Sequence, residues 1–222
     1  MLAEGADWID VGGESTRPGA PAVDVEEECR RVLPVIQALA LDAVVCIDTS
    51  KAEVAARALA AGAQVVNDVT GLRDPELAAV TADARATVVM HMRGTPATMP
   101  GLVDYEDLVC EVRDTLLELA SRARSDEVWI DPGIGFAKTA SQSLTLLRGT
   151  AQLVETGLPV YIGASRKSFI GHTLQQPAPA DRLAGSLAAV AASWQAGARA
   201  FRVHDVAETR QLLDLLVAIH TA

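Results

Sequence analysis

Polar side chains stand where the apolar segments of this sequence end. In residues 128–138, a short apolar run ends at Asp131 and a glycine-rich loop begins at Pro132. Because proline has no amide hydrogen and cannot continue a central strand, Asp131 marks the end of a buried strand. A single aspartate at such a point could simply cap the following turn. The same pattern recurs along the chain, and this repetition indicates a binding site.

The residues at these ends form a chemically coherent set. They are Asp10, Asp48, Asn67, Met90, Asp131, Lys167, Arg202 and His204, with Thr16 and Arg17 in the loop after the first end. The carboxylates of Asp48 and Asp131 and the amide of Asn67 can bind the donor-rich edge of a heterocycle such as an aminopyrimidinone. The arginines and the histidine offer donors that suit phosphate. Gly133, Gly135 and Gly163 would let the backbone approach a flat ring.

Short apolar segments alternate with helical segments along the whole chain. We predict strands at residues 8–13, 44–47, from 65 to 67, 87–92, 127–131, 159–163 and 200–204. We predict helices at residues 25–40, 51–61, 75–82, 104–124, 142–156, 180–196 and 206–219. The strands are apolar nearly throughout, which is typical of a parallel sheet covered by crossover helices.

This alternation predicts an α/β fold, with a (β/α)8 barrel as the leading interpretation. A doubly wound open sheet is the second interpretation, and it is weakened because no GxGxxG motif follows the first strand. We find no linker or change of composition, so we expect residues 1–222 to form one domain. In a parallel barrel the chemistry lies at the carboxyl ends of the strands, where the polar set above is found.

Composition narrows the class of protein further. The chain has 19 basic and 29 acidic residues and a net charge of −10, so nucleic acid is not an expected partner. No apolar run reaches the ~20 residues of a membrane span. Three widely spaced cysteines, Cys29, Cys46 and Cys110, suit neither a disulfide framework nor a metal knuckle. Without a secretory signal at the start, these features predict a cytoplasmic protein.

Seven blocks of the sequence, taken in order, resemble the signature blocks of the dihydropteroate synthase family. They are residues 12–19 (GGESTRPG), 47–49 (IDT), 67–71 (NDVTG), 90–92 (MHM), 131–136 (DPGIGF), 165–168 (SRKS) and 202–204 (RVH). The resemblance implies a (β/α)8 barrel, the pterin-binding fold. It also implies a transferase that joins 6-hydroxymethyl-7,8-dihydropterin pyrophosphate to 4-aminobenzoate in folate biosynthesis, with release of pyrophosphate.

The resemblance also implies roles for individual residues. Asp48, Asn67 and Asp131 would hydrogen-bond the pterin, with Lys167 on its carbonyl edge and with Met90, Phe136 and Gly163 around the ring. Arg202 would cover the ring and, with His204, hold the pyrophosphate. Thr16, Arg17 and Ser168 would shape the aminobenzoate side. Lys167, Arg202 and His204 are the predicted catalytic residues, Mg²⁺ the implied cofactor, and a homodimer the implied assembly.

The chain also departs from the family pattern. The first strand and first loop of the family, with an asparagine associated with the metal, would precede Met1, so we expect seven strands of the barrel and no metal ligand in this chain. Ala137 stands where the family usually has glycine, and Ser143 near its usual asparagine. Two alternatives stay open: a pterin-binding methyltransferase domain, and a non-catalytic pterin-binding protein that does not turn over.

Overall fold

In the described residues, seven parallel strands follow one another across the sheet in the order of the chain. The computed structural model describes residues 1–17 and 19–222; Pro18, in the first of the seven blocks, lies outside them. The strands are β1 Trp8–Gly12, β2 Val44–Asp48, β3 Val65–Asp68, β4 Ala86–Met90, β5 Glu127–Asp131, β6 Tyr161–Ile162 and β7 Ala200–Phe201. β1 to β5 pair in succession, a bridge between Ile130 and Val160 leads on to β6, and β6 pairs with β7. This order has no switch point, so it matches a barrel and not the doubly wound alternative.

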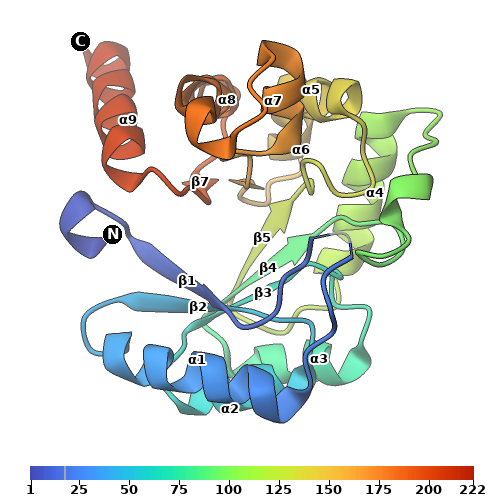
Figure 1. Cartoon of the computed structure of the whole chain (residues 1–222), viewed down its shortest axis with the longest axis vertical. Helices are drawn as coiled ribbons and strands as arrows, with labels where there is room; N and C mark the ends of the chain where they lie inside the picture. Colours follow the sequence, from blue (N-terminus) through green and yellow to red (C-terminus); the bar gives the residue numbers. More distant parts are fainter. Residues whose placement is uncertain (18) are drawn as a thin grey trace.

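β1 and β7 form the two edges of this curved sheet. Among the described residues no backbone pair joins β1 to β7. A side chain spans the distance instead, because the Arg202 guanidinium, just after β7, donates to Asp10 of β1 at 2.7 Å. The short helix η1 Leu2–Glu4 precedes β1 and lies near α9 Val206–Thr221 (Figure 1).

Helices cover the outer side of the sheet in two groups (Figure 1). The first group is α1 Val25–Leu39, α2 Ala52–Ala60 and α3 Pro75–Val80, which lie against β1 to β4. The second is α4 Leu108–Ala120, α5 Ala140–Arg148, α6 Thr150–Val154, α7 Ser168–Leu174 and α8 Leu183–Gln195. Short 3₁₀ turns are η2 Thr81–Asp83, η3 Met99–Gly101 and η4 Pro179–Arg182. No helix in the described part of the chain is both long and apolar enough to cross a bilayer.

Several predicted boundaries are wrong, and one of them is explained by a local helix cap. The helix predicted over 104–124 begins only at Leu108, because the Asp107 side chain accepts from the amide of Cys110 and fixes the first turn there. The helix predicted over 142–156 is broken at Gly149 into α5 and α6. α7 was not predicted; its seven residues are too few to show a helical period. β6 and β7 are shorter than the predicted strands.

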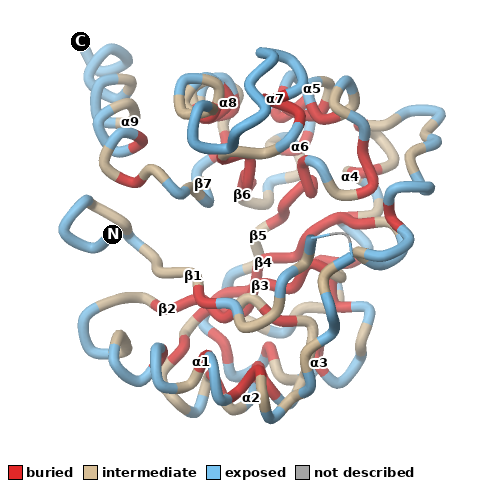
Figure 2. The backbone as a smooth tube through the Cα atoms, viewed as in Figure 1, coloured by how far each residue is buried: buried red, intermediate tan, exposed pale blue. Residues whose placement is uncertain are grey.

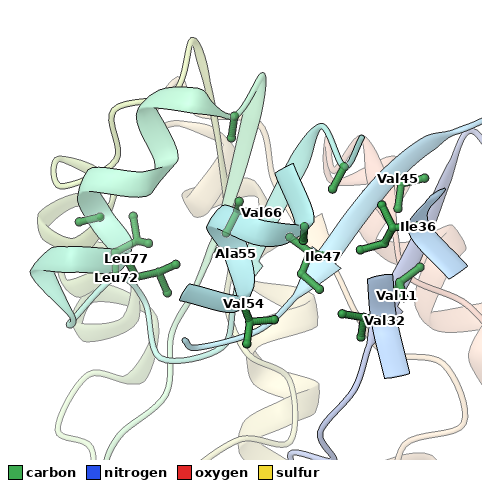
Figure 3. Packing of buried hydrophobic residues seen from close by; sticks show 14 of the residues in the cluster. Val11, Val32, Ile36, Val45, Ile47, Val54, Ala55, Val66, Leu72 and Leu77 are labelled. Atoms are coloured by element: carbon green, nitrogen blue, oxygen red, sulfur yellow. The ribbon is translucent and has the colours of Figure 1, made fainter. Parts of the chain in front are cut away.

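The strands are apolar on both faces, as predicted; Figure 2 shows β2, β3 and β4 among the most buried parts of the chain, whereas the edge strands β1 and β7 are mostly half-buried. On the outer face Val45 and Ile47 lie near Val32 and Ile36 of α1, and Val66 lies beside Ala55 of α2 in the same cluster (Figure 3). The residues of the inner face form a separate cluster of Cys46, Val65, Ala86, Val88 and Tyr161, with the rings of Trp8 and Trp129 edge to face at 5.5 Å. Burial on both faces fixes the register of each strand, and therefore which residues stand at its carboxyl end.

We expect Thr139→Ala to lower the free energy of unfolding by about 1 kcal/mol. Thr139 caps α5: its hydroxyl accepts from the amide of Gln142 at 3.1 Å, and the Gln142 side chain accepts from the amide of Thr139 at 2.8 Å. Thr145→Ala in the same helix is the matched control, since its hydroxyl bonds only to the carbonyl of Ser141 and alanine favours the helix. Urea unfolding of both variants checks this, and an equal loss in the two would contradict the capping account.

Candidate active site

The predicted pterin residues meet at the carboxyl end of the sheet. Asp48 and Asn67 are paired neighbours in the register of β2 and β3, and Met90 is paired with Asp131 in that of β4 and β5. Asn67 and Asp131 are buried, with 5% and 6% of their surface exposed. The Oδ1 atom of Asn67 is buried without a hydrogen-bond partner. An unsatisfied buried acceptor in a row of carboxylates suits a ligand that brings N–H donors.

Asp68, next to Asn67, has a structural role. Its carboxylate accepts from the amides of Thr70 and Leu72 at 2.8 and 2.7 Å and so shapes the turn after β3. Asp68 therefore forms the turn, and the Oδ1 atom of Asn67 is left free to bind a ligand.

Asp131, Lys167 and Arg202 surround the backbone of Gly163. A Cβ atom added to Gly163 would lie 3.7 Å from Oδ2 of Asp131 and 3.9 Å from both Nζ of Lys167 and Cβ of Arg202. The amide of Gly133 donates to the other oxygen of Asp131 at 2.7 Å. Burial raises the pKa of Asp131, and the ammonium of Lys167 opposes this shift. The Asp131 carboxylate, the Lys167 ammonium and the base of the Arg202 side chain therefore lie around one glycine.

Lys167 is placed between the carboxylate and an aromatic ring. Its Nζ donates to the carbonyl of Ile134 and lies 4.7 Å from the centroid of the Phe136 ring. Burial lowers the pKa of Lys167 to about 8, although Asp131 counters this effect. Phe136 packs beside Met90 in a cluster with Met92. The two predicted apolar residues of the pterin pocket thus lie together, next to the predicted lysine.

Arg202 links the two edges of the sheet through two carboxylates. It donates to Asp10 at 2.7 Å and to Asp48 at 3.0 Å. Burial and the neighbouring Asp10 carboxylate raise the pKa of Asp48 to about 7, against the opposing charge of Arg202. Oδ1 of Asp10 is buried without a partner. Sequence reasoning noted Asp10 at a strand end but did not place it in the site; its partnership with Arg202, 192 positions away, has no local signal.

The remaining predicted residues lie on loops at the same end. His204 is exposed, and its Nδ1 lies 3.0 Å from the hydroxyl of Ser165. Burial lowers the pKa of His204, and the charges of Arg166, Arg202 and Arg17 lower it further. Thr16 is half-buried in the same loop as Arg17, and Ser168 is exposed at the first position of α7.

The loop that carries Thr16 and Arg17 is fixed at both ends. Glu14 accepts from the ammonium of Lys51 and from the amide of Val23 at 3.1 Å. Lys51 also donates to the fully buried Glu28 at 2.5 Å. Sequence reasoning missed this Glu14–Lys51–Glu28 group, since the three residues are far apart in the chain.

The described residues contain no group of three or more histidine, cysteine, aspartate or glutamate side chains placed to hold a metal ion. The site instead combines hydrogen-bond acceptors that suit a heterocycle with cations that suit an anion.

Sequence reasoning also missed the pair formed by Lys138 and His91, in which Lys138 Nζ lies 3.0 Å from His91 Nδ1.

Comparison with known proteins agrees with this geometry. A family model described as "Pterin binding enzyme" matches residues 1–204. The dihydropteroate synthase of Synechocystis sp. is 46% identical to this chain over 99% of the chain and 79% of that protein. The solved structure of Xanthomonas albilineans dihydropteroate synthase with 4-aminobenzoic acid is 43% identical, with a TM-score of 0.93 over 100% of this chain and 82% of that one.

A third relative is the structure of Thermus thermophilus dihydropteroate synthase in complex with 6HMPPP. It is 42% identical, with a TM-score of 0.89 over 99% of this chain and 86% of that chain. These similarities extend over nearly all of the chain and include every element that bears a predicted site residue. They favour the synthase over the methyltransferase alternative. The sequence, the strand-end site and the comparisons together show that this chain belongs to the pterin-binding enzyme family, as a relative of the dihydropteroate synthases.

Proposed function

We propose that this protein is a dihydropteroate synthase, which condenses 6-hydroxymethyl-7,8-dihydropterin pyrophosphate with 4-aminobenzoate to give 7,8-dihydropteroate and pyrophosphate. The observation that carries the proposal is the set of buried acceptors at the strand ends, Asn67 and Asp131 above all, beside the cations Lys167 and Arg202. A pterin edge supplies the N–H donors that the acceptors lack. The diphosphate supplies the negative charge that the cations attract.

In the proposed reaction, the bond between the pterin methylene carbon and the diphosphate oxygen breaks, and a bond from that carbon to the aniline nitrogen forms. Positive charge that develops on the pterin is stabilised by the carboxylates of Asp48 and Asp131. The departing diphosphate is held by Arg202, His204 and Lys167. The aniline nitrogen attacks and then loses one proton to solvent or to a released diphosphate oxygen.

The Arg17 loop is the proposed aminobenzoate side of the site. Thr16 and Arg17 lie on this loop and Ser168 begins α7, and the Glu14–Lys51 contact ties the loop to the segment that follows β2. There the carboxylate of 4-aminobenzoate would pair with the positively charged side chain of Arg17.

Magnesium is a prediction from the resemblance. Since the described residues offer no cluster of three metal ligands, we derive no step through a metal. A homodimer and a cytoplasmic location are predictions of the same kind. For the dimer, the exposed apolar side chains of Leu215, Val217 and Ile219 on α9 give some support.

The proposed activity is tested by measuring 7,8-dihydropteroate from both substrates with magnesium present. We expect product that depends on each substrate, and we expect Arg202→Ala to lower kcat/KM by roughly a hundredfold, since it removes a diphosphate cation and leaves Asp10 and Asp48 unpaired. Arg210→Ala, which loses only exposed ion pairs, is the matched control and should match wild type. Pterin binding without product would instead support the non-catalytic alternative.

The raised pKa of Asp48 predicts how stability depends on pH. With a folded pKa of about 7 and a lower unfolded value, folded Asp48 keeps a proton that the unfolded chain loses, so its contribution falls as pH rises between these values. Asparagine cannot titrate. Between about pH 5 and about pH 7, the unfolding free energy of the ligand-free wild type should therefore fall relative to that of Asp48→Asn.

Asp107→Asn serves as the control for this titration. The hydrogen bond from the Cys110 amide lowers the pKa of Asp107, so its titration lies below this range and its difference from wild type should stay constant. Urea unfolding at both pH values checks the two variants. A constant difference for Asp48→Asn as well would mean that Asp48 is ionised throughout.

A further inference from the structure

Lys138 is a buried cation beneath the site, and the reaction proposed above gives it no role. It is 8% exposed. Its Nζ lies 3.0 Å from Nδ1 of His91, 2.9 Å from the carbonyl oxygen of Phe136 and 3.4 Å from the carbonyl oxygen of His91. These three acceptors match the three N–H groups of one ammonium. The contacts join the segment that follows β4 to the loop that follows β5.

Burial lowers the pKa of Lys138 to about 7, the Asp131 carboxylate opposes this shift, and the three acceptors around Nζ favour the charged form. Burial and the charge of Lys138 together lower the pKa of His91 to about 3. His91 is therefore neutral at pH 7, and its Nδ1 can accept from the ammonium. Only three of the 19 basic residues of the chain are lysines, namely Lys51, Lys138 and Lys167, and each contacts groups at this end of the sheet. The planar guanidinium of arginine could not direct three N–H groups from one nitrogen atom to these three acceptors.

The loop between β5 and α5 needs such an anchor. Gly133 has φ of +66°, and a Cβ there would lie 2.0 Å from the carbonyl oxygen of His91 and 3.4 Å from Lys138 Nζ. Ala137 has φ of +50°, a left-handed conformation that is unfavourable for a residue with a side chain. The carbonyl of Ala137 accepts from the Tyr105 hydroxyl at 3.0 Å. Tertiary contacts therefore hold this loop in its shape.

The loop positions two residues of the proposed pterin pocket. Phe136, whose carbonyl Lys138 holds, presents its ring to Lys167. At the other end of the loop, the carbonyl of Asp131 accepts from the amide of His91 at 2.9 Å, and the carboxylate of Asp131 accepts from Gly133. One shift of the loop relative to His91 would move both the ring and the carboxylate.

We propose that Lys138, through His91, is a positioning residue for the pterin substrate: it fixes the loop over 132–137 against the end of β4 so that Asp131 and Phe136 face the pterin. This inference rests on the proposed function. It predicts that loss of the contact weakens pterin binding and leaves the aminobenzoate side, on the Arg17 loop, nearly unchanged.

The test measures KM for each substrate with the other saturating, together with the melting temperature. We expect Lys138→Met to raise KM for the pterin pyrophosphate about tenfold and to change KM for 4-aminobenzoate less than about twofold. Lys138→Arg should not restore the pterin KM, because arginine keeps the charge but cannot donate from one nitrogen atom to all three acceptors. His91→Leu should resemble Lys138→Met, and His91→Asn, which keeps an acceptor, should have a smaller effect.

Thr81→Val is the matched control, because Thr81 is buried and ties the opposite ends of the same two strands. Its hydroxyl donates to the carbonyl of Ala78 at 2.7 Å and accepts from the amide of Arg124 at 2.9 Å. It should lower the melting temperature and leave both KM values unchanged. Lys138 would be a stabilising residue only, and the proposal wrong, if Lys138→Met lowered the melting temperature as Thr81→Val does without raising the pterin KM.

If Lys138→Met does not fold, the two His91 variants decide, and equal pterin KM values for them would overturn the proposal. The outcome is also distinct from failure of the proposed function. If wild type forms no dihydropteroate, the proposed activity fails first. If wild type turns over and the Lys138 and His91 variants keep its pterin KM, only this inference fails.

Discussion

The burial of Asn67 and Asp131 at the end of a parallel sheet constrains the rest of this site. A buried polar group without partners costs free energy. Cations and amides accordingly surround the carboxylates, while Oδ1 of Asn67 and Oδ1 of Asp10 have no partner within the protein. Arg202 pairs with Asp10 and Asp48, Lys167 lies beside Asp131, and glycine 163 leaves room among them. Lys138 anchors the loop that follows β5 to His91, and Lys51 anchors the loop that follows β1 through Glu14.

Much of this could be predicted because it follows from local patterns. Apolar strands without alternation indicate a parallel sheet covered on both faces, and β1 to β5 lie close to where these patterns place them. Asp131 before Pro132, and Asn67 at the end of an apolar run, mark strand ends directly. Once the strands are parallel and in chain order, residues at their carboxyl ends must meet, and the structure brings Asp48, Asn67 and Asp131 together.

The features that were missed depend on contacts between distant segments. Arg202 and Asp10 come together only because β1 and β7 are the two edges of one curved sheet. No local pattern in the sequence indicates that Lys138 is buried. In the structure its loop contains left-handed residues, and the Lys138 ammonium is buried against His91. The start of α4 was wrongly predicted for a local reason, because Asp107 caps the helix while the amphipathic pattern continues upstream. Short elements such as α7 are fixed by packing and leave little periodic signal.

The central claim is that the buried acceptors at the strand ends bind a pterin, and calorimetry with 6-hydroxymethyl-7,8-dihydropterin tests it most directly. Asp131→Asn is nearly isosteric and removes one buried charge. The account predicts that the wild type binds the pterin and that the variant binds it at least about tenfold more weakly, with a melting temperature equal to or above that of wild type. Equal affinity in the two folded proteins would contradict it, because Asp131 would then not contact the ligand.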